Sequence, residues 1–194
     1  MTSNLTTIGK LPEWVPSAVR LYLSHTENGC SLREIARAEG VHASTVLRQV
    51  RRFENRRDDP LVDCALGRLL QPEPEPQDPT ESRAMNHTPP TVTTPQPVDE
   101  ATLDAEARRV LPRLAEQGAV MAVAPDMERA VVMRDGAEGA VRLAVLDRPV
   151  AEAFALRDWI VCIQTGRVSR YEISSAGRTA LRQFGADKTS PPAH

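Results

Sequence analysis

The side chains best suited to chemistry in this 194-residue chain are polar and basic groups between residues 42 and 56. Arginine guanidinium groups bind phosphate oxygens and guanine edges with two parallel hydrogen bonds, and short polar side chains contact phosphates and bases. On one side of a helix, such groups form a surface that fits the major groove of duplex DNA. The predicted DNA-contacting residues in this segment are His42, Ser44, Thr45, Arg48, Gln49, Arg51, Arg52 and Arg56.

Two short helices joined by a sharp turn are predicted to position these side chains. Ser31 is a good N-cap for the first helix, and Gly40 can adopt the positive φ that the turn requires. The pattern predicts a helix-turn-helix over residues 31–57, although Glu39 and Gln49 stand where a small or apolar residue is commoner. The alternative is an ordinary helical hairpin with a solvated basic face. The apolar residues at helical spacing are Leu32, Ile35, Ala36, Val46, Val50 and Phe53.

The charge of the chain is unevenly distributed. Residues 31–57 contain seven arginines and three glutamates, whereas the whole chain has a net charge of −2. Positive charge is therefore concentrated on the predicted helix-turn-helix, as a DNA-binding surface requires.

Composition and motifs exclude several other classes of protein. Cys30, Cys64 and Cys162 form no CxxC pair, so neither a disulfide framework nor a zinc site is indicated, and a reducing cytoplasm is expected. No apolar run approaches the roughly 20 residues of a membrane span. Glycine-rich phosphate loops, nucleophile elbows, paired acidic motifs and histidine clusters are missing from the sequence. We therefore expect a non-enzymatic protein with no cofactor and no metal.

The chain divides into two predicted modules and a linker. The first module spans residues 11–70 and adds a helix from about Pro16 to complete a three-helix core. A fourth short helix over 61–70 either packs back on that core or serves as a self-association surface. Residues 71–98 contain eight of the sixteen prolines and almost no large apolar residues, which predicts a disordered linker.

The second module, residues 99–185, alternates helical and β-prone segments. A helical stripe over 103–114 precedes short β-prone runs, and a helix start at 147–149 precedes a predicted hairpin that turns at 165–167. This order predicts a winged-helix-like α+β domain whose wing carries Arg167 and Arg170 as further DNA contacts. Small α+β domains without DNA-binding duties share the order, and near-neutral charge favours a protein partner. The β-prone runs cover 120–123, 130–133, 141–146, 160–163 and 168–173.

The whole chain is thus predicted to be mainly α, with an N-terminal helix-turn-helix domain of three or four helices, a proline-rich linker and the winged-helix-like domain. The stretch from Arg33 to Asp63, REIARAEGVHASTVLRQVRRFENRRDDPLVD, resembles the N-terminal DNA-binding region of the alphaproteobacterial gene transfer agent activators. The stretches 114–136 and 149–182 resemble the segment that follows it in that family. Residues 42–47, HASTVL, are also similar to the DNA-binding region of a bacterial replication initiator, without its ATPase module.

The resemblance implies a function. Such activators bind promoters of phage-derived particle genes and act on RNA polymerase, either as one long protein or as two cooperating chains. The resemblance therefore implies the DNA-binding half of a split activator, or the N-terminal region of the long form. We expect a cytoplasmic, nucleoid-associated bacterial transcription activator that binds double-stranded promoter DNA. Expected partners are a second activator subunit, RNA polymerase and a second copy in a homodimer, with no membrane contact. The alternatives are a phage- or replication-type initiator or repressor, and a protein-binding adaptor.

Overall fold

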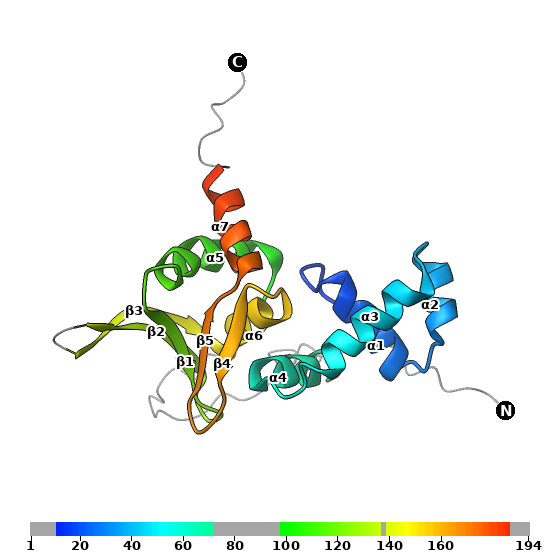
Figure 1. Cartoon of the computed structure of the whole chain (residues 1–194), viewed down its shortest axis with the longest axis horizontal. Helices are drawn as coiled ribbons and strands as arrows, with labels where there is room; N and C mark the ends of the chain where they lie inside the picture. The colour runs from blue at the N-terminus through cyan, green and yellow to red at the C-terminus, as the bar shows by residue number, and fades with distance from the viewer. Residues whose placement is uncertain (1–10, 72–97, 137–138, 187–194) are drawn as a thin grey trace, which may run out of the picture.

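The structure is a computed structural model that describes residues 11–71, 98–136 and 139–186. Within these ranges the chain forms seven helices and five strands, and the strands make one antiparallel sheet (Figure 1). The fold is therefore mixed α/β. The predicted mainly α composition underestimates the sheet, because all the β-prone runs of the C-terminal half join it. Most of the predicted linker lies outside the described residues.

Three helices form the N-terminal part: α1 (Ser17–Thr26), α2 (Leu32–Ala38) and α3 (Ala43–Glu54). Helix α2 begins with a capping box. The Ser31 hydroxyl accepts a hydrogen bond from the Glu34 amide at 3.3 Å, and the Glu34 carboxylate accepts one from the Ser31 amide at 2.8 Å. Two of the free amides at the helix start are satisfied in this way, which fixes where the helix begins.

The turn between α2 and α3 depends on Gly40, whose φ of 64° is a left-handed conformation that glycine adopts without strain. Helix α3 then buries Val46, Val50 and Phe53 against α1 and α2. The Phe53 ring lies 5.8 Å from the Tyr22 ring of α1. The buried side of α3 is thus the side that the sequence predicts.

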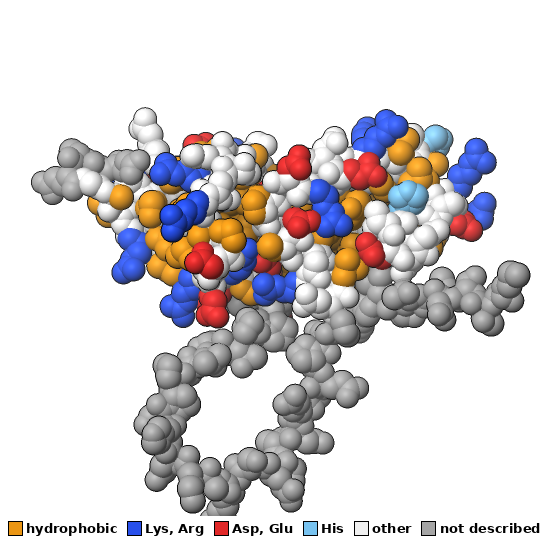
Figure 2. Space-filling view, turned by 90° about the horizontal axis from the view of Figure 1, so that it is seen from below, with side chains coloured by type: hydrophobic (Ala, Val, Ile, Leu, Met, Phe, Trp, Pro, Cys, Tyr) orange, Lys and Arg blue, Asp and Glu red, His pale blue; other side chains and the backbone are white. Residues whose placement is uncertain are grey.

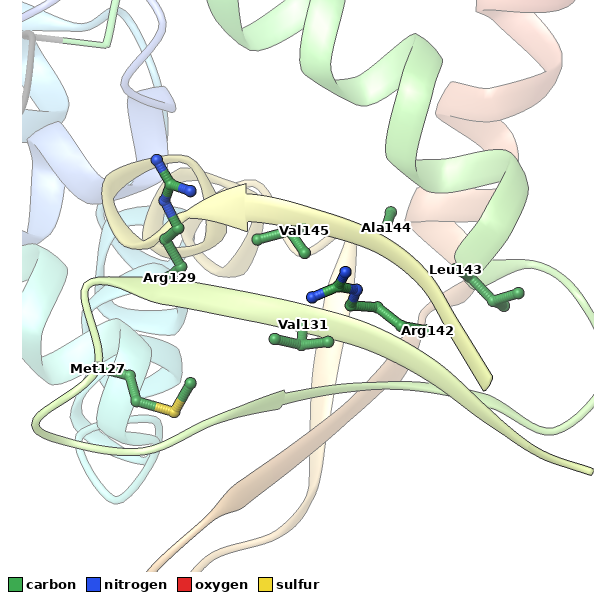
Figure 3. Close-up of a pocket in the computed structure, with 7 residues that line it drawn as sticks. All are labelled: Met127, Arg129, Val131, Arg142, Leu143, Ala144 and Val145. Atoms are coloured by element: carbon green, nitrogen blue, oxygen red, sulfur yellow. The ribbon is translucent and has the colours of Figure 1, made fainter. Parts of the chain in front are cut away.

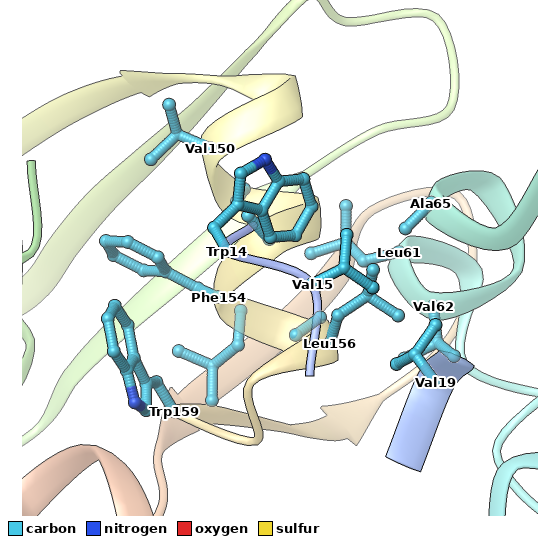
Figure 4. Packing of buried hydrophobic residues seen from close by; sticks show 14 of the residues in the cluster. Trp14, Val15, Val19, Leu61, Val62, Ala65, Val150, Phe154, Leu156 and Trp159 are labelled. Atoms are coloured by element: carbon cyan, nitrogen blue, oxygen red, sulfur yellow. The ribbon is translucent and has the colours of Figure 1, made fainter. Parts of the chain in front are cut away.

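Helix α4 (Pro60–Leu69) connects the N-terminal helices to the C-terminal part. Its apolar side packs against α6 (Arg148–Leu156), and Figure 4 shows its Val62 beside Val19 of α1. The sequence leaves packing on the three-helix core or self-association as alternatives for this helix. The structure shows a further arrangement, in which α4 lies between the two predicted modules.

The five strands are β1 (Ala119–Val123), β2 (Arg129–Gly136), β3 (Gly139–Asp147), β4 (Ile160–Gln164) and β5 (Ser169–Ile173). Their order in the sheet is β3-β2-β1-β5-β4, and every neighbouring pair is antiparallel. Each strand overlaps one of the predicted β-prone runs, and β4 and β5 form the predicted hairpin. These strand predictions are confirmed.

Helices cover one face of the sheet. Helix α5 (Glu100–Leu114), α6 and α7 (Ser175–Ala186) all lie on that side (Figure 1). The side chains directed at them include Met121 and Val132, which are fully buried. Their neighbours along the strands point the other way and are partly exposed, because no described element covers that face.

A single apolar core runs through both predicted modules (Figure 4). Trp14 and Val15, which precede α1, pack beside α6, where Phe154 lies. The Arg157 guanidinium donates a hydrogen bond to the Trp14 carbonyl at 3.1 Å. The sequence does not predict this contact between the modules, because its apolar residues are distant in the chain and each belongs to a locally complete amphipathic pattern.

Candidate nucleic-acid interface

The side of α3 that faces away from the core carries three of the predicted DNA-contacting residues. Ser44, Arg48 and Arg51 are exposed and lie opposite the buried Val46 and Val50. This segregation follows from the helical period, since residues three and four positions apart share a side. The helix therefore presents a polar and basic strip to solvent while its apolar side holds it in place.

His42 is the N-cap residue of α3. Its Nδ1 accepts a hydrogen bond from the Ser44 amide at 3.3 Å and lies 2.8 Å from the Ser44 hydroxyl oxygen. His42 therefore caps α3, and its predicted contact with DNA stays a prediction. The ring is exposed, so it remains on the same surface as the start of the strip.

Four arginines of the α2–α3 pair have no ion-pair partner within the described residues. Arg33 and Arg37 are exposed on α2, and Arg48 and Arg51 are exposed on α3. All the other arginines between residues 31 and 57 form ion pairs. The four exposed guanidinium groups therefore remain available to an anionic ligand, and within the described chain only the Arg37 charge acts on a nearby carboxylate, that of Glu34.

Arg52 and Arg56 are directed at the C-terminal part of the chain. Each guanidinium contacts a different carboxylate oxygen of Asp158. Arg56 also donates to the Ala155 carbonyl at 2.8 Å, and its side chain is only 19% exposed. The sequence predicts both arginines as DNA contacts. In the structure they connect the end of α3 to the loop after α6, and their contact with DNA stays a prediction.

Thr45 and Gln49 lie at the edge of the exposed strip. Both side chains are partly buried, and the Gln49 carbonyl oxygen Oε1 is buried without a hydrogen-bond partner among the described residues. An unsatisfied buried oxygen is costly. Gln49 is therefore less available to an external ligand than Arg48, which is exposed on the same helix.

The two predicted wing arginines occupy different places on the β4–β5 hairpin. Arg167 is exposed at the hairpin tip, whereas Arg170 is opposite Ala122 of β1 and projects from the uncovered face of the sheet. Figure 1 shows this hairpin and the start of α3 in different parts of the molecule. The structure does not gather the wing arginines and Arg48 into one patch.

Two buried polar clusters between the modules are missed by sequence reasoning. The Tyr171 hydroxyl donates to Asp59 at 2.8 Å and accepts from the Leu61 amide at 3.3 Å, and burial together with the Asp59 charge raises the pKa of Tyr171. Glu152, 2% exposed, forms ion pairs with Arg68 and Arg148. Burial raises the pKa of Glu152, and the two guanidinium groups oppose that rise. The N-cap position of Asp59 is the only local signal for either cluster.

Neither a metal-binding cluster nor a membrane-spanning helix is found in the described part of the chain. No group of three or more histidine, cysteine or acidic side chains there could hold a metal ion. None of the helices in the described ranges is both long and apolar enough to cross a membrane.

An open hollow of about 500 Å³ lies on the uncovered sheet face, lined by aliphatic side chains, Arg129 and Arg142.

Comparison with known proteins does not identify a relative. No family model, curated protein or solved structure matches this chain. A function for the chain must therefore be argued from its own residues. The relevant residues are the four exposed arginines of α2 and α3, which form no ion pair with the other described residues.

Proposed function

We propose that this chain is a DNA-binding protein in which α2 and α3 act as a helix-turn-helix. The observation that carries the proposal is the exposed strip of α3, where Arg48 and Arg51 have no ion-pair partner among the described residues. An α-helix of this kind fits the major groove, where arginine reads guanine through two hydrogen bonds. The remaining face of α3 is buried, so the strip can enter the groove without exposing the core.

The neighbouring residues have supporting roles in this proposal. Arg33 and Arg37 of α2 contact phosphates beside the groove, because they are exposed and unpaired among the described residues. His42 fixes the start of α3 and holds the Ser44 hydroxyl near the base edges. Thr45 and Gln49 contribute at the edge of the strip. Arg52 and Arg56 position α3 through Asp158.

Arginine substitutions test the proposal. The preferred duplex is first selected from a random pool, and affinity is then measured by fluorescence anisotropy at several salt concentrations. Arg48→Ala is expected to weaken binding by about 1–3 kcal/mol, or roughly 5- to 150-fold, and to relax sequence preference at one position. Arg37→Ala is expected to weaken all sequences alike and to reduce the salt slope by about one unit.

The matched control is Arg178→Ala, which removes an exposed arginine of α7 that has no ion-pair partner among the described residues. This variant is expected to retain wild-type affinity, since it lies on another surface. If Arg48→Ala, Arg51→Ala and Arg178→Ala all bind the selected duplex as tightly as the wild type, α3 is not the interface and the proposal fails.

The biological output proposed for this DNA binding rests on the sequence resemblance. We propose a transcription activator of phage-derived particle genes that acts in the bacterial cytoplasm with a second, polymerase-contacting subunit. A repressor or replication initiator would bind DNA through the same strip. The activator and repressor roles are distinguished by measuring transcript yield from the selected site with purified polymerase, with and without the second subunit. Activation that requires the subunit supports the proposal, whereas repression by this chain contradicts it.

We also propose that the C-terminal part acts as a winged-helix-like domain. This proposal is supported by the β4–β5 hairpin, whose tip exposes Arg167. A wing of this kind would contact the phosphate backbone beside the groove. Arg167→Ala is expected to weaken binding to all duplexes equally, and unchanged affinity would exclude the wing. Arg170 projects from the uncovered face of the sheet, opposite Ala122.

A further inference from the structure

The uncovered face of the sheet carries mainly aliphatic side chains. Val161 and Ile163 of the edge strand β4 are each 48% exposed, and their neighbours on β1, β2 and β3 are partly exposed. Figure 2 shows these hydrophobic side chains gathered in a patch with arginines among and around them. We call this surface the open sheet face. Its aliphatic members on the strands are Val120, Ala122, Val131, Met133, Val145, Val161 and Ile163.

Two unpaired arginines stand within this aliphatic surface. The strand register places Arg170 opposite Ala122 and Arg142 opposite Met133, so both side chains project from the open sheet face. Neither guanidinium has an ion-pair partner among the described residues. Two acidic groups share this face: Glu172, opposite Val161, and Asp147, which forms an ion pair with Arg129. The open sheet face is therefore apolar with a positive excess.

The surface is also hollowed. The open hollow of about 500 Å³ lies over β2 and β3, and Figure 3 shows Val131, Val145 and Arg142 lining it. A register shift between Val132 and Met133 accompanies the hollow. Such a shift bends a strand and increases its twist locally. The hollow offers a seat for side chains of another molecule.

We propose that the open sheet face binds an amphipathic helix of a partner protein, with an aliphatic stripe flanked by acidic side chains. The stripe packs on the valines of β1, β2 and β4, and the carboxylates pair with Arg142 and Arg170. Charge complementarity selects this partner, because a basic helix would place like charges together. Burial of the exposed valines supplies the attraction.

The same observations disfavour a nucleic acid on this face. Proteins that bind single strands on a sheet stack the bases on aromatic side chains. Tyr171 is the one aromatic residue on the described strands, and it is fully buried on the helix-covered side. The described part of the open sheet face therefore offers no aromatic side chain on which a base could stack. This inference goes beyond the proposed DNA-binding function and does not depend on it, since the α3 strip and the open sheet face share no residue.

The test uses a fluorescent peptide of about 20 residues, which as a helix spans about 30 Å. It carries leucines at helical spacing with flanking glutamates, and a second peptide has lysine at every glutamate position. Binding to the full chain is followed by anisotropy at low salt. The acidic peptide is expected to bind about tenfold or more tightly than the basic peptide.

Charge-reversal variants then locate the binding site. Arg142→Glu and Arg170→Glu are expected to weaken the acidic peptide about tenfold and to strengthen the basic one. Ile163→Ser is expected to weaken both peptides, because it removes apolar contact area. The matched control Arg178→Glu makes the same charge change on α7 and should leave both affinities unchanged. Circular dichroism confirms that each variant is folded.

Three outcomes overturn the proposal: no binding of the acidic peptide, equal binding of the two peptides, or an affinity that all three open-face variants leave unchanged. Self-association of the wild-type chain that Ile163→Ser abolishes also overturns it, because the occupant is then a second copy. Affinity for the selected DNA duplex is measured in parallel. A failure of DNA binding leaves the peptide results intact, so the two proposals fail independently.

Discussion

The contact of Asp158 with Arg52 and Arg56 gives the sharpest quantitative prediction about this chain. Asp158 has a φ of 58°, which an aspartate or asparagine side chain tolerates better than most others. The variant Asp158→Asn therefore keeps the backbone preference and one acceptor oxygen, and it removes the charge that holds the two guanidinium groups. Any loss of stability then reports the ion pairs rather than backbone strain.

The expected size follows from exposure. The Arg52 side chain is 48% exposed, so its pair with Asp158 contributes about 0.2–1 kcal/mol. Arg56 is 19% exposed, and a hydrogen bond to a charged group contributes about 1.5–3 kcal/mol in such surroundings. Asparagine keeps part of both interactions. Asp158→Asn is therefore expected to lower the free energy of unfolding by about 1–3 kcal/mol.

Urea unfolding followed by tryptophan fluorescence measures this loss. Trp14 and Trp159 both belong to the shared core, so they should report one transition with one midpoint. A double-mutant cycle with Arg56→Gln isolates the pair, with an expected coupling of about 1–2 kcal/mol. The matched control Asp126→Asn alters an exposed aspartate that has no ion-pair partner among the described residues and should change stability by less than about 0.5 kcal/mol.

Arg48→Gln completes the comparison, because it changes an exposed and unpaired arginine of the same helix. It is expected to spare stability and reduce DNA affinity, whereas Arg56→Gln should reduce stability and lower DNA affinity less than Arg48→Gln does, because Arg56 positions α3 and does not itself contact the DNA. Two results refute the reasoning. Effects of Asp158→Asn and Arg56→Gln that simply add would show that the pair stabilises nothing, and an Arg56→Gln variant that loses only DNA affinity would return Arg56 to the DNA-contacting set.

Three further predictions concern stability. A Cβ at Gly177 would lie 2.1 Å from the Trp159 carbonyl oxygen, so Gly177→Ala should unfold the chain at much lower urea than Gly185→Ala, where nothing lies within 4 Å. Ser31→Ala removes half of the capping box and should cost about 1 kcal/mol, measured by the same urea titration. Burial and Asp59 raise the pKa of Tyr171, so the folded chain retains a proton that an unfolded tyrosine releases above about pH 10. The contribution of Tyr171 to the free energy of unfolding is therefore fully present below that pH and is lost as the pH rises above it. In Tyr171→Phe the free energy of unfolding should fall less steeply with pH, and equal slopes in the two proteins would contradict the raised pKa.

The sequence predicts the local elements of this fold well. The N-cap at Ser31, the turn at Gly40 and the apolar side of α3 each depend on residues within a few positions of one another, and the structure contains all three. The strands follow from short β-prone runs for the same reason. Local patterns such as these are fixed by backbone geometry and helical or strand periodicity.

The contacts between distant segments could not be predicted in this way. Asp158 lies 102 residues from Arg56 in the chain, and its positive φ has no sequence signature because it is not a glycine. The sequence of β4 likewise does not reveal which face of the strand is buried. Ile160 is buried, Val161 and Ile163 are exposed, and Cys162 between them is partly buried, so apolar residues occupy both faces of the strand. Only the arrangement of the helices decides which face remains open.

The same long-range contacts join the two candidate interfaces through a short piece of chain. Asp158, which holds the end of α3, is two residues before Ile160, where β4 begins. That strand contributes Val161 and Ile163 to the open sheet face. The α3 strip is therefore held in place by the same segment that forms the edge of the proposed docking surface. On this geometry the C-terminal part sets the orientation of α3, and with it the orientation of the exposed Arg48 and Arg51.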